Sequence, residues 1–303
     1  MAKNKFYSLK RILKEKADVN IVYGERSSGK TFSALEFAVR DYVKNGNQAV
    51  YMRRQKDEID GAKKTDIFGG LVSTDKIKEI TKGVYDNVYV RGTKAYLATY
   101  NEDGKMIRDE RPFMHFIIIS LQQKFKSLAY PDVRNVIYDE FLTRTGEIAD
   151  EWSQYLNALS TVIRRRDNVR IFLLGNTVNP FSIYFEHYGI RDQVRKMNPG
   201  DVYVMTTRKG LKIAVEYTEP NVSAQKSSKY FDLGDSTGNM IVSGGWETAH
   251  YPKPPAFAKK DIYFTYFIIY SGYILQCEMI STGDQLFTFI HEKTTPMKNE
   301  DED

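Results

Sequence analysis

Gly24-Glu25-Arg26-Ser27-Ser28-Gly29-Lys30-Thr31 is the stretch that decides the fold. It matches the phosphate-loop pattern G-x-x-x-x-G-K-[ST] at every fixed position. An apolar, strand-like run over residues 19–23 precedes it, and a helix-like run to residue 44 follows it. In such a loop the glycines let the backbone wrap a pyrophosphate, the lysine reaches the β and γ oxygens, and the threonine ligates magnesium. We therefore expect residues 24–31 to bind a nucleoside triphosphate with Mg²⁺; the alternative is a chance glycine-rich turn before a helix.

The composition is that of a globular protein. The chain has 303 residues and 42% hydrophobic content, which is enough for two domains or for one large domain with an appendage. The net charge of +5 permits a polyanionic partner without requiring one. The single cysteine, Cys277, excludes an internal disulfide, and the four histidines lack the spacing of a zinc site.

No segment is typical of a signal peptide or of a membrane span. Residues 1–16 alternate lysine with apolar residues and build no signal-peptide core. The most apolar run, residues 262–270, is too short to cross a bilayer and, with residues 273–275, is typical of a β-hairpin. We expect a protein of the cytoplasm with no membrane partner.

Continuous apolar runs predict a mainly parallel sheet, because strands covered on both faces are apolar at nearly every position. Runs of this kind occupy residues 116–120, 133–138 and 169–174. We also expect a strand at residues 48–52, a hairpin over residues 85–100 and a crossover helix at residues 151–164. The expected fold class is α/β, a three-layer phosphate-loop NTPase.

Changes in composition predict three parts of the chain. Residues 1–205 are expected to form an ATPase domain, and residues 206–253, which are rich in Ser, Gly and Lys, a lid or linker. After the stiff break Pro252-Lys253-Pro254-Pro255, residues 254–303 are expected to form a small β-rich domain with three strands.

Two acidic residues end the apolar strand at residues 133–138. In phosphate-loop enzymes the first such acid, here Asp139, holds magnesium, and an adjacent glutamate, here Glu140, can orient and deprotonate the attacking water. The second acid and the absence of a guanine-reading Asn-Lys-x-Asp sequence favour ATP hydrolysis over phosphotransfer or a GTP switch. The alternative is two acids exposed at a strand end by chance.

Four other polar positions each allow two interpretations. Asn176, at the end of the next apolar strand, is either a γ-phosphate sensor or the cap of a turn. Arg164 ends the expected crossover helix and either compensates the helix macrodipole, the commoner case, or reaches the site of a neighbouring subunit. Arg53 and Lys56 are either surface charge or a phosphate-contacting edge.

The ordered motifs resemble those of the DNA-packaging ATPases, or encapsidation proteins, of small Picovirinae-type tailed bacteriophages, which are relatives of the large terminases. The resemblance spans residues 1 to about 185, and the most distinctive part of it is Tyr130-Pro131-Asp132-Val133 before the acidic strand. The other motifs that carry it are Gly24 to Thr31 with Arg26 inside the loop, Tyr51-Met52-Arg53-Arg54-Gln55-Lys56, Val136 to Phe141, Thr161 to Arg164 and Val169 to Asn176.

The resemblance implies a RecA-like ring ATPase, with an additional strand between the phosphate-loop strand and the acidic strand. It implies a homo-oligomeric ring, a pentamer in such phages, that drives double-stranded DNA through a portal, or connector, into a preformed procapsid in the host cytoplasm. A structural packaging RNA is a further implied partner. By the same resemblance Arg164 becomes an arginine finger acting in trans, Arg53 and Lys56 act across the subunit interface, and Asn176 becomes a sensor.

The resemblance also implies a C-terminal domain related to ribonuclease H that has lost its cutting role. The sequence after residue 255 is short for such a fold and carries no inward acidic cluster for two metals, so we expect no nuclease activity. The function that we expect is ATP-driven genome packaging. The alternatives are a helicase or recombination ATPase, which strand displacement would reveal, and a nucleotide-gated assembly protein without turnover.

Overall fold

The computed structural model describes residues 6–143, 148–177, 181–220, 257–270, 273–282 and 285–293. The chain divides into two compact units, Met1–Ala249 and His250–Asp303, and each is described by itself. Among the helices of the described ranges, none is long and apolar enough to cross a membrane.

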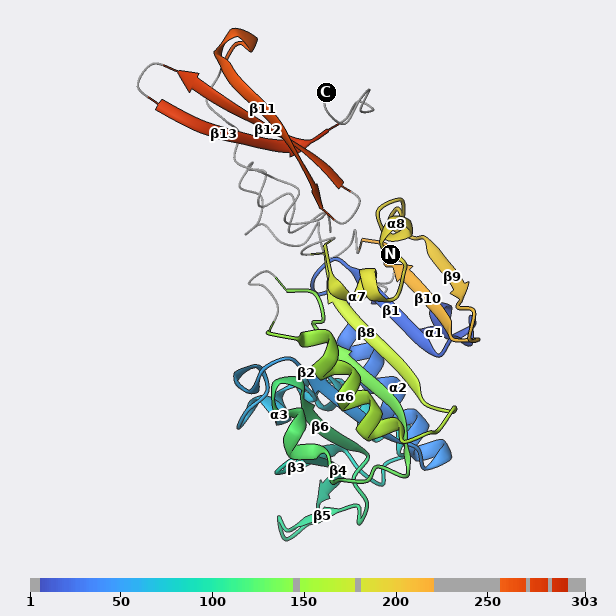
Figure 1. The fold of residues 1–303 in the computed structure, drawn as a ribbon. Coiled ribbons are helices and arrows are strands. Elements are labelled where there is room, and N and C mark those ends of the chain that lie inside the picture. Colours follow the sequence, from blue (N-terminus) through green and yellow to red (C-terminus); the bar gives the residue numbers. More distant parts are fainter. Residues whose placement is uncertain are drawn as a thin grey trace. The chain divides into compact units, whose positions relative to one another are not determined.

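A ten-stranded sheet is the centre of the first unit (Figure 1). Its strands are β1 Val19–Gly24, β2 Gln48–Arg53, β3 Asn87–Arg91, β4 Lys94–Tyr100, β5 Met106–Arg108, β6 Met114–Ile118, β7 Val133–Asp139, β8 Arg170–Asn176, β9 Val202–Thr206 and β10 Lys212–Tyr217. They lie in the order β3-β4-β6-β2-β7-β8-β1-β10-β9, and β5 pairs with β4. The six strands from β6 to β10 in this order run parallel, and the strands at both sides of them are antiparallel.

Helices cover both faces of this sheet. They are α1 Lys10–Leu13, α2 Lys30–Asn45, α3 Lys63–Asp66, α4 Gly69–Ser73, α5 Lys76–Ile80, α6 Glu151–Ile163, α7 Ile183–His187 and α8 Arg191–Val194, with 3-10 turns η1 Lys56–Glu58 and η2 Ile119–Phe125. Side chains of α1, α2, α4 and α5 share one apolar core with the sheet, and those of α6, η2, α7 and α8 share the other. The three predicted layers are therefore present.

The strands predicted from continuous apolar runs are confirmed. Every residue of β7 except Arg134 is buried, and so is every residue of β8 except its two ends, Arg170 and Asn176. Helices lie on both faces of these strands. The hairpin β3–β4 and the crossover helix α6 also form where the sequence predicts them. Strand β8 lies between β1 and β7 in the sheet, which is the additional strand that the resemblance implies.

One part of the expected lid or linker lies in the main sheet. Residues 212–217 form β10, which pairs in parallel with β1 from Val19↔Ile213 to Tyr23↔Tyr217 and is almost wholly buried. This short strand gains its stability from a partner that is nearly 200 residues away in sequence, and local composition does not reveal such a partner. Residues 221–253 of the expected lid lie outside the described residues.

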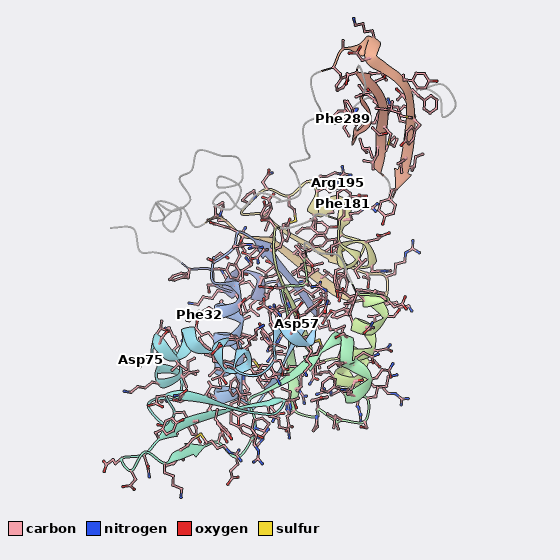
Figure 2. The ribbon with its side chains drawn as sticks, turned by 90° about the vertical axis from the view of Figure 1, so that its left-hand side faces the viewer. Phe32, Asp57, Asp75, Phe181, Arg195 and Phe289 are labelled. Atoms are coloured by element: carbon pink, nitrogen blue, oxygen red, sulfur yellow. The ribbon has the colours of Figure 1, made fainter. Side chains whose placement is uncertain are left out.

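The second unit contains a three-stranded antiparallel sheet, as the sequence predicts. After the 3-10 turn η5 Lys259–Asp261, its strands are β11 Ile262–Tyr270, β12 Tyr273–Thr282 and β13 Gln285–Glu292, in the order β11-β12-β13. Cys277 and Ile280 of the central strand are buried. Phe289 lies on β13 (Figure 2). Phe257 packs against it, with ring centroids 6.1 Å apart. A kinship of this sheet with ribonuclease H stays a prediction.

Candidate active site

The predicted site residues of the phosphate loop and of β7 and β8 meet at one edge of the sheet. Parallel strands bring their carboxyl ends to the same edge, and in the register Gly24 of β1 pairs with Asn176 of β8. Asp139 ends β7, the next strand, where it pairs with Leu174. The phosphate loop joins β1 to α2 at this edge, in the predicted order of strand, loop and helix.

The backbone of the loop uses conformations that favour glycine. Gly29, which precedes α2, has φ of 94°, and Gly24 has φ of 153°. A Cβ atom on Gly24 would lie 2.0 Å from Thr218 Oγ1, so no larger side chain fits there without movement. Ser27 also has positive φ, 56°. The loop therefore has the curvature that backbone binding of a phosphate requires.

Lys30 is buried over the loop. Its Nζ donates to the carbonyl oxygens of Glu25 at 2.6 Å and Gly24 at 3.3 Å and to Ser28 Oγ at 3.2 Å. Burial lowers the pKa of Lys30 to about 8, against the opposing effect of Asp139 and Glu25. A buried ammonium group whose charge is favoured by an added anion suits a phosphate contact.

Asp139 and Thr31 form the second element of the site. Thr31 Oγ1 donates to the carboxylate of Asp139 at 3.0 and 3.1 Å, and Tyr51 donates to Asp139 Oδ2 at 2.6 Å. Burial raises the pKa of Asp139, while the Tyr51 hydrogen bond and the charge of Arg53 lower it. The hydroxyl and carboxylate oxygens are the hard donors that Mg²⁺ prefers.

A magnesium ion at this place would need ligands besides these two side chains. Within the described ranges no group of three or more His, Cys, Asp or Glu residues could hold a metal. Mg²⁺ is commonly bound through one or two protein oxygens together with substrate phosphates and waters. The pair Thr31 and Asp139 fits that kind of site rather than a cage made only of protein.

Glu140 follows Asp139 in a left-handed conformation. Its φ is 56°, which costs a residue with a side chain about 1 kcal/mol or more. The Glu140 carboxylate is half-exposed and receives a hydrogen bond from Arg53 Nη2 at 2.8 Å. Arg53 is itself held by Glu58, 3.2 Å from its Nε, and lies 3.7 Å from Asp139. Arg53 therefore contacts both acids of its own chain.

A pocket of about 470 Å³ opens beside these groups. Asn176 lines it together with Arg26 and Ser27 of the phosphate loop and with Glu140, and the role of Asn176 as a γ-phosphate sensor stays a prediction. The residues that line it are Arg26, Ser27, Arg54, Glu58, Glu140, Leu142, Thr143 and Asn176. A polyanion in this pocket would meet cationic and amide donors on one side and the carboxylate of Glu140 on the other.

Two predicted site residues lie away from this group. Arg164 ends α6, which begins after the carboxyl end of β7 and stops before the amino end of β8, so about 20 Å of helix separates Arg164 from that edge. Arg164 is exposed, and its Nη2 donates to the carbonyl oxygens of Leu128 at 2.6 Å and Lys126 at 3.3 Å. Lys56 is 64% exposed and pairs with Asp60 at 3.2 Å.

Sequence reasoning missed the roles of Tyr51 and Arg54. Tyr51 and Arg53 lie on the same face of β2, because side chains alternate along a strand, and both reach Asp139. Arg54 is buried, and its Nε donates to Glu151 at 2.8 Å. Alternation along β2 places Tyr51 and Arg53 on one face, but it does not reveal Asp139 and Glu151 as the partners of Tyr51 and Arg54.

Comparisons with known proteins identify relatives of this chain. The sequence profile of the podovirus DNA encapsidation protein (Gp16) family matches residues 1–204. The DNA packaging proteins of Bacillus phages PZA and phi29 are each 30% identical to this chain over 199 residues, which cover 65% of this chain and 54% of those proteins. The chain thus spans about half the length of the curated relatives that it matches.

Solved structures share the fold. The crystal structure of the N-terminal domain of the DNA packaging ATPase from bacteriophage phi29 matches with a TM-score of 0.53 and 27% identity, over 70% of this chain and 95% of that domain. The phi-28 gp11 DNA packaging motor matches with a TM-score of 0.57 and 20% identity, over 97% of this chain and 81% of the other. At that identity the second likeness concerns the fold alone.

Proposed function

Because this chain belongs to the podovirus DNA encapsidation protein (Gp16) family, we propose that it is an ATPase that drives double-stranded DNA into a preformed procapsid. The observation that carries the proposal is the contact of Thr31 with Asp139, the residue next to Glu140, which lines a pocket together with Arg26 and Ser27 of the phosphate loop. This is the arrangement of charges that phosphoryl transfer needs, a phosphate cradle next to an oxygen-ligand pair and a base.

In the proposed mechanism the phosphate loop holds the triphosphate of ATP. Lys30 and the loop amides neutralise its β and γ oxygens, and Asn176 contacts the γ-phosphate. Glu140 accepts a proton from a water whose oxygen attacks the γ-phosphorus, while the bond to the leaving ADP breaks. Thr31 and Asp139 would hold Mg²⁺, which supplies charge neutralisation to the phosphates when bound.

Arg53 and Arg164 have different places in this mechanism. The contacts of Arg53 with Glu140 and Asp139 support a role within its own site, where it holds the base before ATP is cleaved. Arg164 is exposed and far from its own loop, which supports action on the site of the next subunit in a ring. Lys56 is an exposed cation after β2 and is proposed to face the same interface.

The partners follow from the family. We propose a homo-oligomeric ring, a pentamer, that works on the portal of the procapsid in the host cytoplasm and contacts duplex DNA through its phosphates rather than its bases. A structural packaging RNA is a further proposed partner. The relatives bear the names of DNA packaging proteins, which supports this assignment. No nuclease activity is proposed for the C-terminal sheet.

The substitution Glu140→Gln tests the proposed hydrolysis. It removes the base and preserves size, so we expect ATP affinity to stay within about threefold and turnover to fall by about 10³-fold. Phosphate release, measured with DNA and procapsids, gives the rate, and titration calorimetry gives the affinity. Glu102→Gln, a change in the exposed turn between β4 and β5, is the matched control. Unchanged hydrolysis in Glu140→Gln would remove Glu140 from this role.

A further inference from the structure

Arg54 holds the backbone of Glu140, the residue that acts as general base in the proposed function. It follows β2, and its side chain is 5% exposed. Two of its nitrogens donate to consecutive carbonyl oxygens after β7: Nη1 to Glu140 O at 3.3 Å and Nη2 to Phe141 O at 2.7 Å. The guanidinium group therefore clamps the peptide groups on the carboxyl side of Glu140.

The same guanidinium group reaches the first residue of α6. Arg54 Nε donates to Glu151 Oε2 at 2.8 Å, and the Glu151 side chain is wholly buried. Glu151 also accepts hydrogen bonds from the hydroxyls of Tyr138 at 3.0 Å and Tyr184 at 2.6 Å, and from Ile148 N at 3.1 Å. A buried ion pair with all its oxygens satisfied fixes one geometry, because any other leaves a charge without partners.

Glu140 needs such support more than an ordinary residue does. Its left-handed backbone is a conformation that residues with side chains seldom adopt and that persists only when the surroundings enforce it. On the amino side, Glu140 N donates to Asp139 Oδ1 at 3.1 Å. On the carboxyl side, Arg54 donates to the Glu140 and Phe141 carbonyl oxygens, and Phe141 N donates to Leu174 O at 3.2 Å. The backbone oxygen of Arg54 in turn accepts from Ser120 N at 3.1 Å.

We propose that Arg54 is a positioning residue: through the Glu140 and Phe141 carbonyls it holds the Glu140 carboxylate in the orientation that activates water, and through Glu151 it ties this orientation to α6. The two adjacent arginines then divide the work. Arg53 binds the carboxylate of Glu140, and Arg54 binds its backbone. This inference rests on the proposed function.

Arg54→Lys in the full 303-residue chain is the first test. An ammonium group is a single point charge and cannot span Glu151 and two carbonyl oxygens at once. We expect the single-turnover rate of ATP hydrolysis to fall 10- to 100-fold, while the Kd for ATP stays within threefold. Arg170→Lys is the matched control, because it alters a guanidinium–carboxylate pair, with Asp41 at 3.1 Å, at the opposite edge of the sheet. It should leave both quantities within threefold.

A double-variant cycle separates positioning from general packing. If Arg54 acts through Glu140, the change Arg54→Lys has no further effect on the residual rate once Glu140→Gln is present. Three outcomes would each overturn the inference. The effects of Arg54→Lys and Glu140→Gln on the rate could multiply in the double variant, Arg54→Lys alone could keep a rate within threefold of the parent, or it could lose as much ATP affinity as rate. Should Arg54→Lys fail to fold, Glu151→Gln, which keeps shape and removes the charge, meets the same criteria.

Failure of the proposed function has a separate signature. An unsubstituted chain that neither binds nor hydrolyses ATP, with procapsids and DNA present, would refute the ATPase assignment before any variant is compared. An active unsubstituted chain with an equally active Arg54→Lys variant would refute only the positioning role.

Discussion

The two edges of the main sheet use buried polar side chains in different ways. At the carboxyl edge, Glu140 lines a pocket and its carboxylate is half-exposed, next to the buried side chains of Asp139 and Lys30. At the amino edge, the carboxylate of Asp41 receives four amide or guanidinium groups and has nothing left to bind. Its partners there are Asn45, Asn47, Asn135 and Arg170, at 2.6 to 3.2 Å.

Backbone strain follows the same division, with one exception. Positive φ angles gather at the carboxyl edge, at Gly24, Ser27, Gly29 and Glu140. The exception is a set of exposed cations at the amino edge, Lys16, Arg164 and Arg165, with φ of 51°, 41° and 63°. Hydrogen bonds such as those to Asp41 stabilise a fold, whereas strained and exposed charges are typical of sites that bind or react. Arg164 thus belongs to a set of amino-edge residues whose features match the other edge.

Arg164→Ala gives the largest expected effect and tests that exception. We expect the ATPase rate of assembled rings to fall by about 10³-fold, or about 4 kcal/mol in the barrier, since a finger supplied in trans stabilises the charge of the transferred phosphoryl group. The midpoint of thermal unfolding should change little, because Arg164 is exposed and its partners are two carbonyl oxygens. Phosphate release from procapsid-bound rings measures the rate.

Mixed rings decide where Arg164 acts. A ring that mixes Arg164→Ala and Lys30→Ala subunits should regain part of its activity. The intact phosphate loop of an Arg164→Ala subunit can then receive the intact Arg164 of a neighbouring Lys30→Ala subunit. Arg111→Ala is the control: Arg111 is also exposed at the amino edge, 3.0 Å from Asp132, and its loss should leave the rate unchanged. Activity lost only in each substituted subunit's own site would contradict action in trans.

Paired glycine substitutions compare the two edges directly. Gly24→Ala places a methyl group 2.0 Å from Thr218 Oγ1, so we expect a loss of roughly 3 kcal/mol in the free energy of unfolding together with a loss of ATP binding. Gly46→Ala, after α2 at the amino edge, meets nothing within 4 Å and should cost only about 1 kcal/mol, through its φ of 73°. Urea titrations with and without ATP measure both. Equal effects at the two positions would remove the contrast.

Local sequence signals were enough to predict which residues lie at the carboxyl edge. The phosphate loop, Asp139, Glu140 and Asn176 each follow an apolar strand, and parallel strands bring such ends together by geometry alone. The phosphate loop also has fixed spacing, because each position touches a different part of one ligand. Strand order needed the resemblance, since periodicity does not say which apolar strand pairs with which.

The features that the sequence did not predict depend on long-range pairing. Tyr51 and Arg54 find partners 88 and 97 residues away, in Asp139 and Glu151, and no local pattern marks such a contact. Strand β10 falls within the expected lid or linker, because its partner β1 lies nearly 200 residues away in the sequence. The same argument explains why Arg53, expected at a subunit interface, contacts Glu140 of its own chain.

The pH dependence of the free energy of unfolding tests, through His115, whether buried polar groups at the amino edge stabilise the fold. His115, the second residue of β6, contacts Gln48 at 3.0 Å and the ring of Tyr130. Burial, aided by Lys94, lowers the pKa of His115 to about 4 from 6.5, so between these values the unfolded chain binds more protons than the folded one. Stability is therefore lost as the pH falls from 6.5 towards 4.

From pH 7 to pH 5 the loss due to His115 should be roughly 2 kcal/mol in the free energy of unfolding. His115→Gln, which has no titrating ring, should show a smaller fall over the same range, and the difference between the two urea curves isolates the imidazole. ATP affinity should respond equally to pH in both proteins, because His115 lies at the edge opposite the phosphate loop. If the stability of His115→Gln changed with pH as much as that of the parent, His115 would take up protons equally in the folded and the unfolded chain, which would contradict the prediction.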